Sequence, residues 1–270
     1  MSRIALVGNL AVDRVAGGPP RPGGGVYWAA RAAAHIGADA VVVTRCAPGD
    51  RDVALAPLEA FGLPVVSVDA AETTAFSFHY EGDHRVMNVD AVGDDWTTSD
   101  LSGWAASALA DAEWVQVAGL LRSHFPTETV EALASDGHRL LLDAQGSLRR
   151  AETGPLQRDD EFDRSTFGHL AVLKVNEDEG RVLAGSLETE PLRALGVGEV
   201  ILTLGSQGAR VIDGDTVADI PPFPTRGEVD PTGAGDSFSV VYLDGRVRGL
   251  NPVAAARRAS ETVADLISRG

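Results

Sequence analysis

Lysine is almost absent from this 270-residue chain, which has one at position 174 and uses arginine for its other basic side chains. Acidic residues outnumber basic ones by 39 to 23, so the formal net charge is −16. A nucleic-acid-binding surface needs a basic face to meet the phosphate backbone. We therefore expect no nucleic acid among the partners. A polyanionic ligand would need backbone N–H groups, arginines or a metal ion to bind here.

Cysteine is equally scarce, with Cys46 alone in the chain. One cysteine excludes an internal disulfide and a cysteine-based zinc site. The six histidines are scattered and show no metal-ligand spacing. No apolar run approaches the roughly 18–20 residues of a membrane span, and the first residues lack the pattern of a signal peptide. We expect a cytoplasmic protein without a membrane partner.

Two nucleotide-binding motifs are also missing. The sequence contains no Gly-x-x-x-x-Gly-Lys-Ser/Thr, which excludes a P-loop kinase. No Gly-x-Gly-x-x-Gly follows the first predicted strand, so a dinucleotide-binding dehydrogenase has no support.

Short apolar runs that read as buried strands alternate with helical patterns along the chain. The predicted strands are 4–7, 40–45, 65–68, 114–118, 139–143, 170–175 and 200–204. This alternation predicts an α/β fold with a mostly parallel sheet, and we assign residues 1–270 to a single domain. A hairpin around Glu81-Gly82-Asp83, within 73–92, and the segment 11–22 are expected to form a small β lid. The hairpin could equally be an ordinary sheet edge.

The stretch 230–236, Asp-Pro-Thr-Gly-Ala-Gly-Asp, is the most informative part of the sequence. Gly233 and Gly235 flank Ala234, and a largely apolar run follows to Gly249, as expected for a turn that opens a helix. Free N–H groups and the positive end of a helix dipole make such a start an anion site. A carboxylate there, Asp236, suits a base for phosphoryl transfer to a hydroxyl. The simpler alternative is a turn with an N-cap aspartate.

This stretch resembles the C-terminal signature of the ribokinase-like (PfkB) family of sugar and nucleoside kinases. Five segments resemble the family's motifs and occur in its order: 9–13, 23–25, 176–179, 203–208 and 230–236. The resemblance implies a three-layer α/β/α sandwich with a small β lid. It also implies the use of ATP and Mg²⁺, with Asp236 as base and the N–H groups of Gly233, Ala234 and Gly235 as the anion hole.

On the acceptor side, the resemblance assigns substrate binding to Asn9, Asp13, Gly24 and Gly25. A carboxylate such as Asp13 can accept hydrogen bonds from two adjacent hydroxyls. Taken alone, Asp13 would be read as a surface turn aspartate. Trp28 stands where the family usually has asparagine; it could stack on a sugar or a base, or simply belong to the core.

On the donor side, Asn176 and Glu179 resemble the motif that holds Mg²⁺ through water, and the same residues could form a capping box. Three further residues match the nucleotide-binding turn, which as a lone motif is usually only a turn: Thr203, Gly205 and Gly208. Arg149 is a candidate phosphate clamp, because we expect the site to lack a lysine. The string 142–149 resembles the inositol-kinase-like branch, and Asp230 is a candidate ligand of a monovalent cation such as K⁺.

Together these features predict an ATP-dependent phosphotransferase that acts on a hydroxyl of a small sugar or polyol. Two alternatives stay open. One is a nucleoside or hydroxymethyl-pyrimidine kinase of the same fold, and the other is a non-catalytic member that binds nucleotide or sugar. The family's lid often forms a dimer interface, so a homodimer through the lid is a further expectation.

Overall fold

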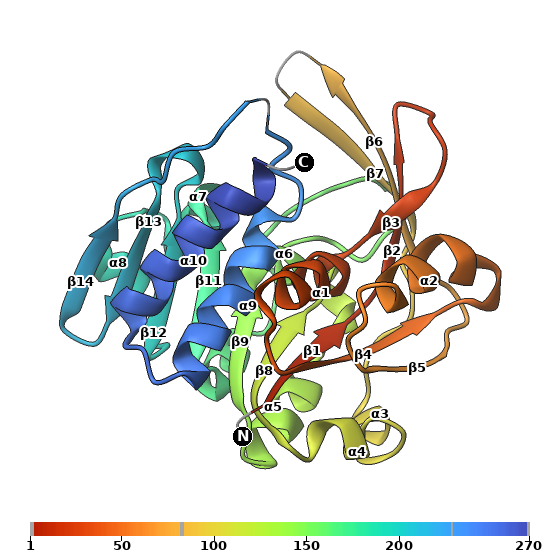
Figure 1. Cartoon of the computed structure of the whole chain (residues 1–270), viewed down its shortest axis with the longest axis horizontal. Coiled ribbons are helices and arrows are strands. Elements are labelled where there is room, and N and C mark those ends of the chain that lie inside the picture. Colours follow the sequence, from red (N-terminus) through yellow and green to blue (C-terminus); the bar gives the residue numbers. More distant parts are fainter. Residues whose placement is uncertain (1–2, 82–83, 228, 269–270) are drawn as a thin grey trace.

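A computed structural model describes residues 3–81, 84–227 and 229–268. Within these ranges a nine-stranded sheet has the order β14-β13-β12-β11-β9-β8-β1-β4-β5 (Figure 1). Its strands are β1 (Arg3–Gly8), β4 (Ala40–Cys46), β5 (Val65–Asp69), β8 (Ala112–Ala118), β9 (Arg139–Asp143), β11 (Val172–Asn176), β12 (Glu199–Thr203), β13 (Ala209–Asp213) and β14 (Thr216–Ile220). Neighbours pair in parallel from β5 to β12, and β13 and β14 continue antiparallel.

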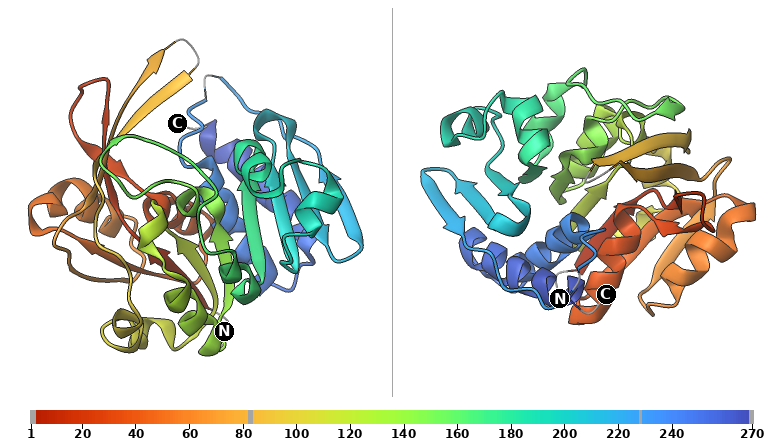
Figure 2. Two further views of the ribbon diagram at one scale, coloured as in Figure 1. Left: turned by 180° about the vertical axis from the view of Figure 1, so that it is seen from behind. Right: turned by 90° about the horizontal axis from the view of Figure 1, so that it is seen from above.

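Helices cover both faces of this sheet (Figures 1 and 2). One face packs against α1 (Gly25–Ile36), α2 (Ala56–Glu59), α9 (Ala234–Val247) and α10 (Pro252–Ile267). The other packs against α3 (Thr98–Ser102), α4 (Ala106–Leu109), α5 (Thr127–Ser135), α6 (Ala144–Ser147), α7 (Glu177–Ala184) and α8 (Thr189–Arg193). In β1, Ile4 and Leu6 enter the first core, while Ala5 and Val7 enter the second. The three-layer α/β/α prediction is confirmed.

A separate five-stranded sheet has the order β10-β7-β6-β2-β3, and its β6–β7 hairpin projects at the top of Figure 1. Its strands are β2 (Ala11–Val15), β3 (Arg21–Gly23), β6 (Thr74–Glu81), β7 (His84–Ala91) and β10 (Gly154–Pro155). Strand β2 pairs with β6, so the predicted lid segments 11–22 and 73–92 lie in one sheet. The turn predicted at Glu81-Gly82-Asp83 includes residues 82–83, which lie outside the described residues.

The local structure differs from the sequence pattern in three places. The Gly- and Pro-rich segment 16–25 predicts no regular structure but contains β3, and the two-residue β10 was not predicted. The pattern of residues 50–61 predicts a helix interrupted by Pro57, but the structure has a 3₁₀ turn (Pro48–Asp50), a π-helical turn (Arg51–Leu55) and the short α2. Proline at the start of α2 lacks an N–H donor, so the hydrogen-bond pattern changes there.

Gly208 and Gly137 offer a matched test of what the turn after β12 requires. Both have a left-handed backbone, with φ of 99° and 92°. A Cβ on Gly208 would collide with the carbonyl oxygen of Ile220, whereas a Cβ on Gly137 would meet nothing within 4 Å. Each Gly→Ala substitution should lower the free energy of unfolding by about 1 kcal/mol, because alanine disfavours a left-handed backbone. Gly208→Ala should lower the free energy of unfolding by about 1–3 kcal/mol more, because the chain must shift to relieve the collision.

Denaturant unfolding of the two variants measures this difference. Equal losses of stability would contradict the close approach of residues 208 and 220.

Candidate active site

The start of α9 lies at the carboxyl edge of the large sheet. Gly233 precedes the helix with φ of 75°, and Asp236 lies in the first turn. The N–H of Ala234 donates to the carbonyl oxygen of Pro231 at 3.0 Å. An anion that used all three predicted donors would have to displace this bond.

Asp236 faces the start of a second helix. A Cβ atom on Gly25, the first residue of α1, would lie 2.8 Å from Asp236 Oδ1 and 3.0 Å from the Cβ of Ala118. Only a residue without a side chain leaves room for the carboxylate here. The N-termini of α1 and α9 therefore meet at Asp236, and both helix dipoles present their positive ends to this region.

Lys174 lies in this site, so the expectation that the site lacks a lysine is wrong. It is on β11, is 4% exposed, and pairs with Asp143 at the end of β9. A Cβ on Gly235 would lie 3.0 Å from Lys174 Nζ, so the ammonium is next to the backbone of the anion hole. The sequence did carry a signal: the chain's one lysine lies inside an apolar strand, two residues before Asn176, and so faces the same side of the strand.

Burial and the nearby Asp143 raise the pKa of Asp236 to about 7, although Lys174 and Arg149 act in the opposite direction. Burial and Asp143 also raise the pKa of Glu179. Burial alone would lower the pKa of Lys174, but Asp143, Glu179 and Asp236 together raise it. The pKa of the proposed base is therefore well above the ordinary 3.8 of an aspartate. A carboxylate that titrates near neutral pH is better matched to proton transfer.

Arg149 is the second cation of this cluster. It is 7% exposed, and its charge lowers the pKa of both Asp236 and Glu179. Its guanidinium carbon lies 5.8 Å from the ring centroid of Phe76 on β6. Arg149 thus lies between the charged cluster and the small sheet.

Asn176 and Glu179 form the capping box that starts α7. The Asn176 N–H and side-chain amide both donate to the Glu179 carboxylate at 2.8 Å, and the Glu179 N–H donates to Asn176 Oδ1 at 2.9 Å. The described residues contain no cluster of three or more His, Cys, Asp or Glu that could hold a metal ion.

A cavity of about 960 Å³ opens beside this cluster. Its polar lining includes Lys174, Asn176, Glu179, Thr203 and the 233–236 turn, with Gly205 and Gly208 beside them. Its apolar lining includes Pro222, Phe223, Pro224 and Val229, and Val263, Ala264 and Ile267 of α10. The cavity is therefore polar at Asp236 and apolar against α10.

The predicted acceptor residues lie on the opposite side of Asp236, except Trp28. Asp13 on β2 is 6% exposed and packs against Gly23. Trp28 packs its ring against Gly233, where any Cβ would collide with it, so it supports the start of α9. Asn9 is 2% exposed and is hydrogen-bonded to Asp94 and Trp96. Asp230 is exposed and accepts from the N–H of Thr232 at 2.9 Å.

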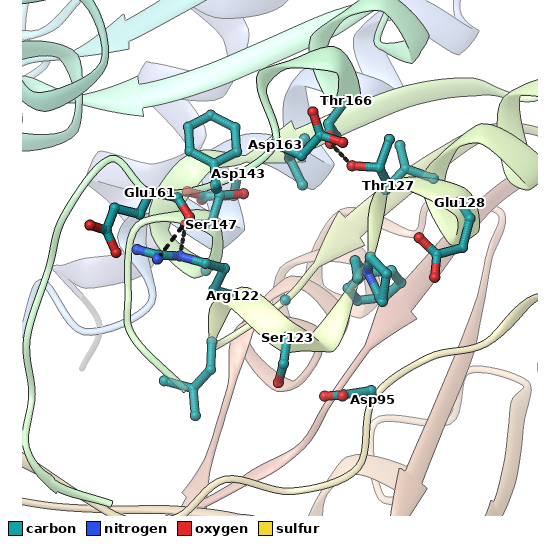
Figure 3. Close-up of a pocket in the computed structure, with 18 residues that line it drawn as sticks. Asp95, Arg122, Ser123, Thr127, Glu128, Asp143, Ser147, Glu161, Asp163 and Thr166 are labelled. Carbon is teal, nitrogen blue, oxygen red and sulfur yellow. Dashed lines mark hydrogen bonds between the residues drawn. The ribbon is translucent and has the colours of Figure 1, made fainter. Parts of the chain in front are cut away.

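A second cavity of about 370 Å³ lies on the other side of Asp143 (Figure 3). Arg122 on its wall donates to the carbonyl oxygens of Ser147 and Glu161, and Thr127 bonds Thr166. The Arg122 guanidinium is thus held by backbone carbonyl oxygens and by an ion pair with Asp159. Asp143 lines both cavities, so it forms part of the wall between them.

The fold and this cluster define a phosphotransferase. The model of the pfkB family of carbohydrate kinases matches residues 11–269, so the chain belongs to that family. Ribokinase of Bacillus subtilis is 29% identical over 96% of this chain and 91% of its own length. Inositol 3-kinase of Oryza sativa is 32% identical over 48% of this chain and 33% of its own.

A solved structure supports the same fold. A pyrophosphate-dependent kinase of the ribokinase family, complexed with a pyrophosphate analog and myo-inositol, superposes with a TM-score of 0.83. It is 24% identical, and the match covers 97% of this chain and 93% of that one. The family model thus confirms the predicted family, and this superposition supports the predicted fold. No helix among the described residues is long and apolar enough to cross a membrane.

The raised pKa of Asp236 predicts a pH-dependent cost in stability. A carboxyl whose folded pKa is about 7, against an ordinary 3.8, holds its proton better when folded. Its contribution to stability is therefore lost as the pH rises through that window. Asp236→Asn should be more stable than the wild type at pH 8, by on the order of 1–4 kcal/mol, and the difference should shrink toward pH 5.

Unfolding free energies measured at pH 5 to 8 test this, with Asp215→Asn on an exposed turn as the control. A difference that stays constant across this range would mean that Asp236 is ionised throughout.

Proposed function

We propose that this protein transfers the γ-phosphate of ATP, with Mg²⁺, to a hydroxyl of a small sugar or polyol. The observation that carries the proposal is Asp236, held between the N-termini of α1 and α9 with Lys174 beside it. A base, helix N-termini and a buried cation in one place suit phosphoryl transfer, where positioning and electrostatic stabilisation supply most of the catalysis. Ribokinase and inositol kinase relatives support a polyhydroxylated acceptor.

The shape of the large cavity favours a nucleotide over pyrophosphate as donor. Pyrophosphate would need only the polar end around Lys174 and the 233–236 turn. The apolar side against α10 would remain unused, although such a surface suits the flat face of a base. One structural neighbour is pyrophosphate-dependent, so the choice of donor is the first point to test.

In the proposed reaction, Asp236 orients the acceptor hydroxyl and takes its proton as that oxygen attacks the γ-phosphorus. The bond from phosphorus to the bridging oxygen breaks, and ADP leaves. The N–H groups of 233–235 and the ammonium of Lys174 stabilise the charge on the transferring group. Arg149 assists from the side of the small sheet.

Magnesium would neutralise the donor phosphates and would be held through water by Asn176 and Glu179. The protein's own cations do not outnumber its carboxylates in this cluster: Lys174 and Arg149 face Asp143, Glu179 and Asp236. A polyanionic donor therefore needs a metal ion to approach. Asp230 stays a prediction for a monovalent cation such as K⁺.

The acceptor would lie between Asp236 and the small sheet, with Asp13, Gly24 and Gly25 around it. We propose that the small sheet serves as a lid, and a dimer through it stays a prediction. A nucleoside acceptor is the main alternative. The position of Asp236 between two helix N-termini argues against a non-catalytic member, because a binding protein does not need a base there.

Acceptor-dependent ADP release tests the proposed reaction. Across a panel of polyols, sugars and nucleosides, Asp236→Asn should lower kcat by about 10²–10⁴ while ATP still binds. Asp13→Ala should chiefly raise the acceptor KM. Substantial turnover by Asp236→Asn would refute the assigned base. No turnover across the panel by an ATP-binding wild type would favour the non-catalytic reading.

The donor can be tested by narrowing the apolar end of the cavity. Ser260 of α10 lines it, whereas the neighbouring Glu261 is exposed. Ser260→Phe should raise the ATP KM roughly tenfold or more, because the ring fills space that the base needs. Glu261→Phe adds the same ring on the solvent side and should leave KM unchanged. Turnover with pyrophosphate that equals turnover with ATP, and is untouched by Ser260→Phe, would overturn the nucleotide donor.

A further inference from the structure

The small sheet joins the main domain through chain crossings that lie close to one another (Figure 1). Residues 9–10 connect β1 to β2, and Gly24 connects β3 to α1. Residues 70–73 lead from β5 into β6, and residues 92–97 return from β7 to α3. The angle of the small sheet over Asp236 depends on how these crossings are held.

Asn9 ties three of these crossings together. Its side-chain amide donates to the carbonyl oxygen of Asp94 at 2.7 Å, and its Oδ1 accepts from Trp96 Nε1 at 2.7 Å. A Cβ on Gly24 would lie 2.7 Å from the carbonyl oxygen of Asn9. The side chain is 2% exposed, so these partners replace water.

Trp96 is the fixed end of this connection. It is fully buried, stacks on Phe125 with ring centroids 5.5 Å apart, and has the guanidinium of Arg45 4.5 Å from its ring centroid. Its backbone N–H donates to the carbonyl oxygen of His124 at 2.8 Å, and its own carbonyl oxygen accepts from Thr129 Oγ1 at 2.8 Å. Strand β4, helix α5 and the loop before α5 thus hold it in the main domain.

The crossing at residues 92–97 is also held by hydrogen bonds at the end that follows β7. The carbonyl oxygen of Val92 accepts from Thr74 Oγ1 at 2.9 Å and lies 2.7 Å from His124 Nε2. The N–H of Ala71 donates to Asp94 Oδ2 at 2.8 Å, which links the 70–73 crossing to the same segment. Asn9 therefore connects the start of β2 to a segment that is itself held firmly.

We propose that Asn9 is a positioning residue, which sets the angle of the small sheet over the active site through Trp96 and Asp94 and does not bind the acceptor directly. This rests on the proposed kinase function. Asp13 lies on β2, four residues after Asn9, while Gly25 and Asp236 belong to the main domain. A tilt of β2 would move Asp13 relative to Asp236, and the acceptor would lose its alignment.

The Trp96→Phe variant distinguishes a positioning role of Asn9 from direct contact between Asn9 and the acceptor. It keeps an aromatic ring but removes the indole N–H that Asn9 accepts. For a positioning residue, Asn9→Ala and Trp96→Phe should each raise the acceptor KM roughly three- to tenfold, and the double variant should add little. Trp104→Phe is the matched control, because it removes an indole bond to Asp100 in the same aromatic cluster without touching Asn9.

Acceptor analogues that lack one hydroxyl supply the decisive comparison. If Asn9 bound a hydroxyl, the effect of Asn9→Ala would vanish with the analogue that lacks it, and Trp96→Phe would leave KM unchanged. Either result would overturn the proposal.

Amide hydrogen exchange tests the same idea without any turnover. Asn9→Ala and Trp96→Phe should both speed exchange in residues 11–15 and 92–97, relative to the wild type and to Trp104→Phe. Unchanged exchange in both variants would overturn the proposal even if the kinase reaction is confirmed. Faster exchange in a protein without kinase activity would instead point to failure of the proposed function alone.

Discussion

The burial of Lys174 against Asp143 is the interaction on which the proposed chemistry depends. A buried ammonium is stable only when a carboxylate compensates for its lost water, and the sheet register supplies one. Strands β9 and β11 are neighbours, and their register places Lys174 directly opposite Asp143. The pair brings a cation under the start of α9, yet it also places a second carboxylate near Asp236. That carboxylate and burial together raise the pKa of Asp236.

The two helix N-termini that meet at Asp236 can approach because glycine lies at each contact. Gly25 leaves room for the carboxylate, and Gly233 leaves room for the ring of Trp28. Helix α1 therefore contacts the anion hole through Trp28 while its first residue faces the base. The helix that begins at the proposed acceptor site thus also supports the proposed phosphoryl site.

Much of this arrangement could be predicted from the sequence, because polar residues after buried strands converge at one edge of a parallel sheet. Asn176 at the end of β11 and Thr203 at the end of β12 follow this rule, whereas the 230–236 turn was recognised by its motif. The role of Lys174 was not predicted, because a lysine inside an apolar strand does not indicate its partner. That partner, Asp143, lies 31 residues earlier in the chain. Trp28 and Asn9 were assigned from motif position alone, and their contacts with Gly233 and Trp96 depend on distant segments. Strand β10 has two residues, too few for any periodicity.

If the proposed function holds, the same buried contacts would link the donor side of the site to the acceptor side. Arg149 contributes its charge to Asp236 and Glu179 and lies over Phe76 of the small sheet. The chain leaves the small sheet at Gly24, which packs against the carbonyl oxygen of Asn9. The next residue, Gly25, faces Asp236. A shift of the small sheet would therefore change the surroundings of the base from two directions at once. Closure over an acceptor and activation of Asp236 would then be one event, since the same residues carry both.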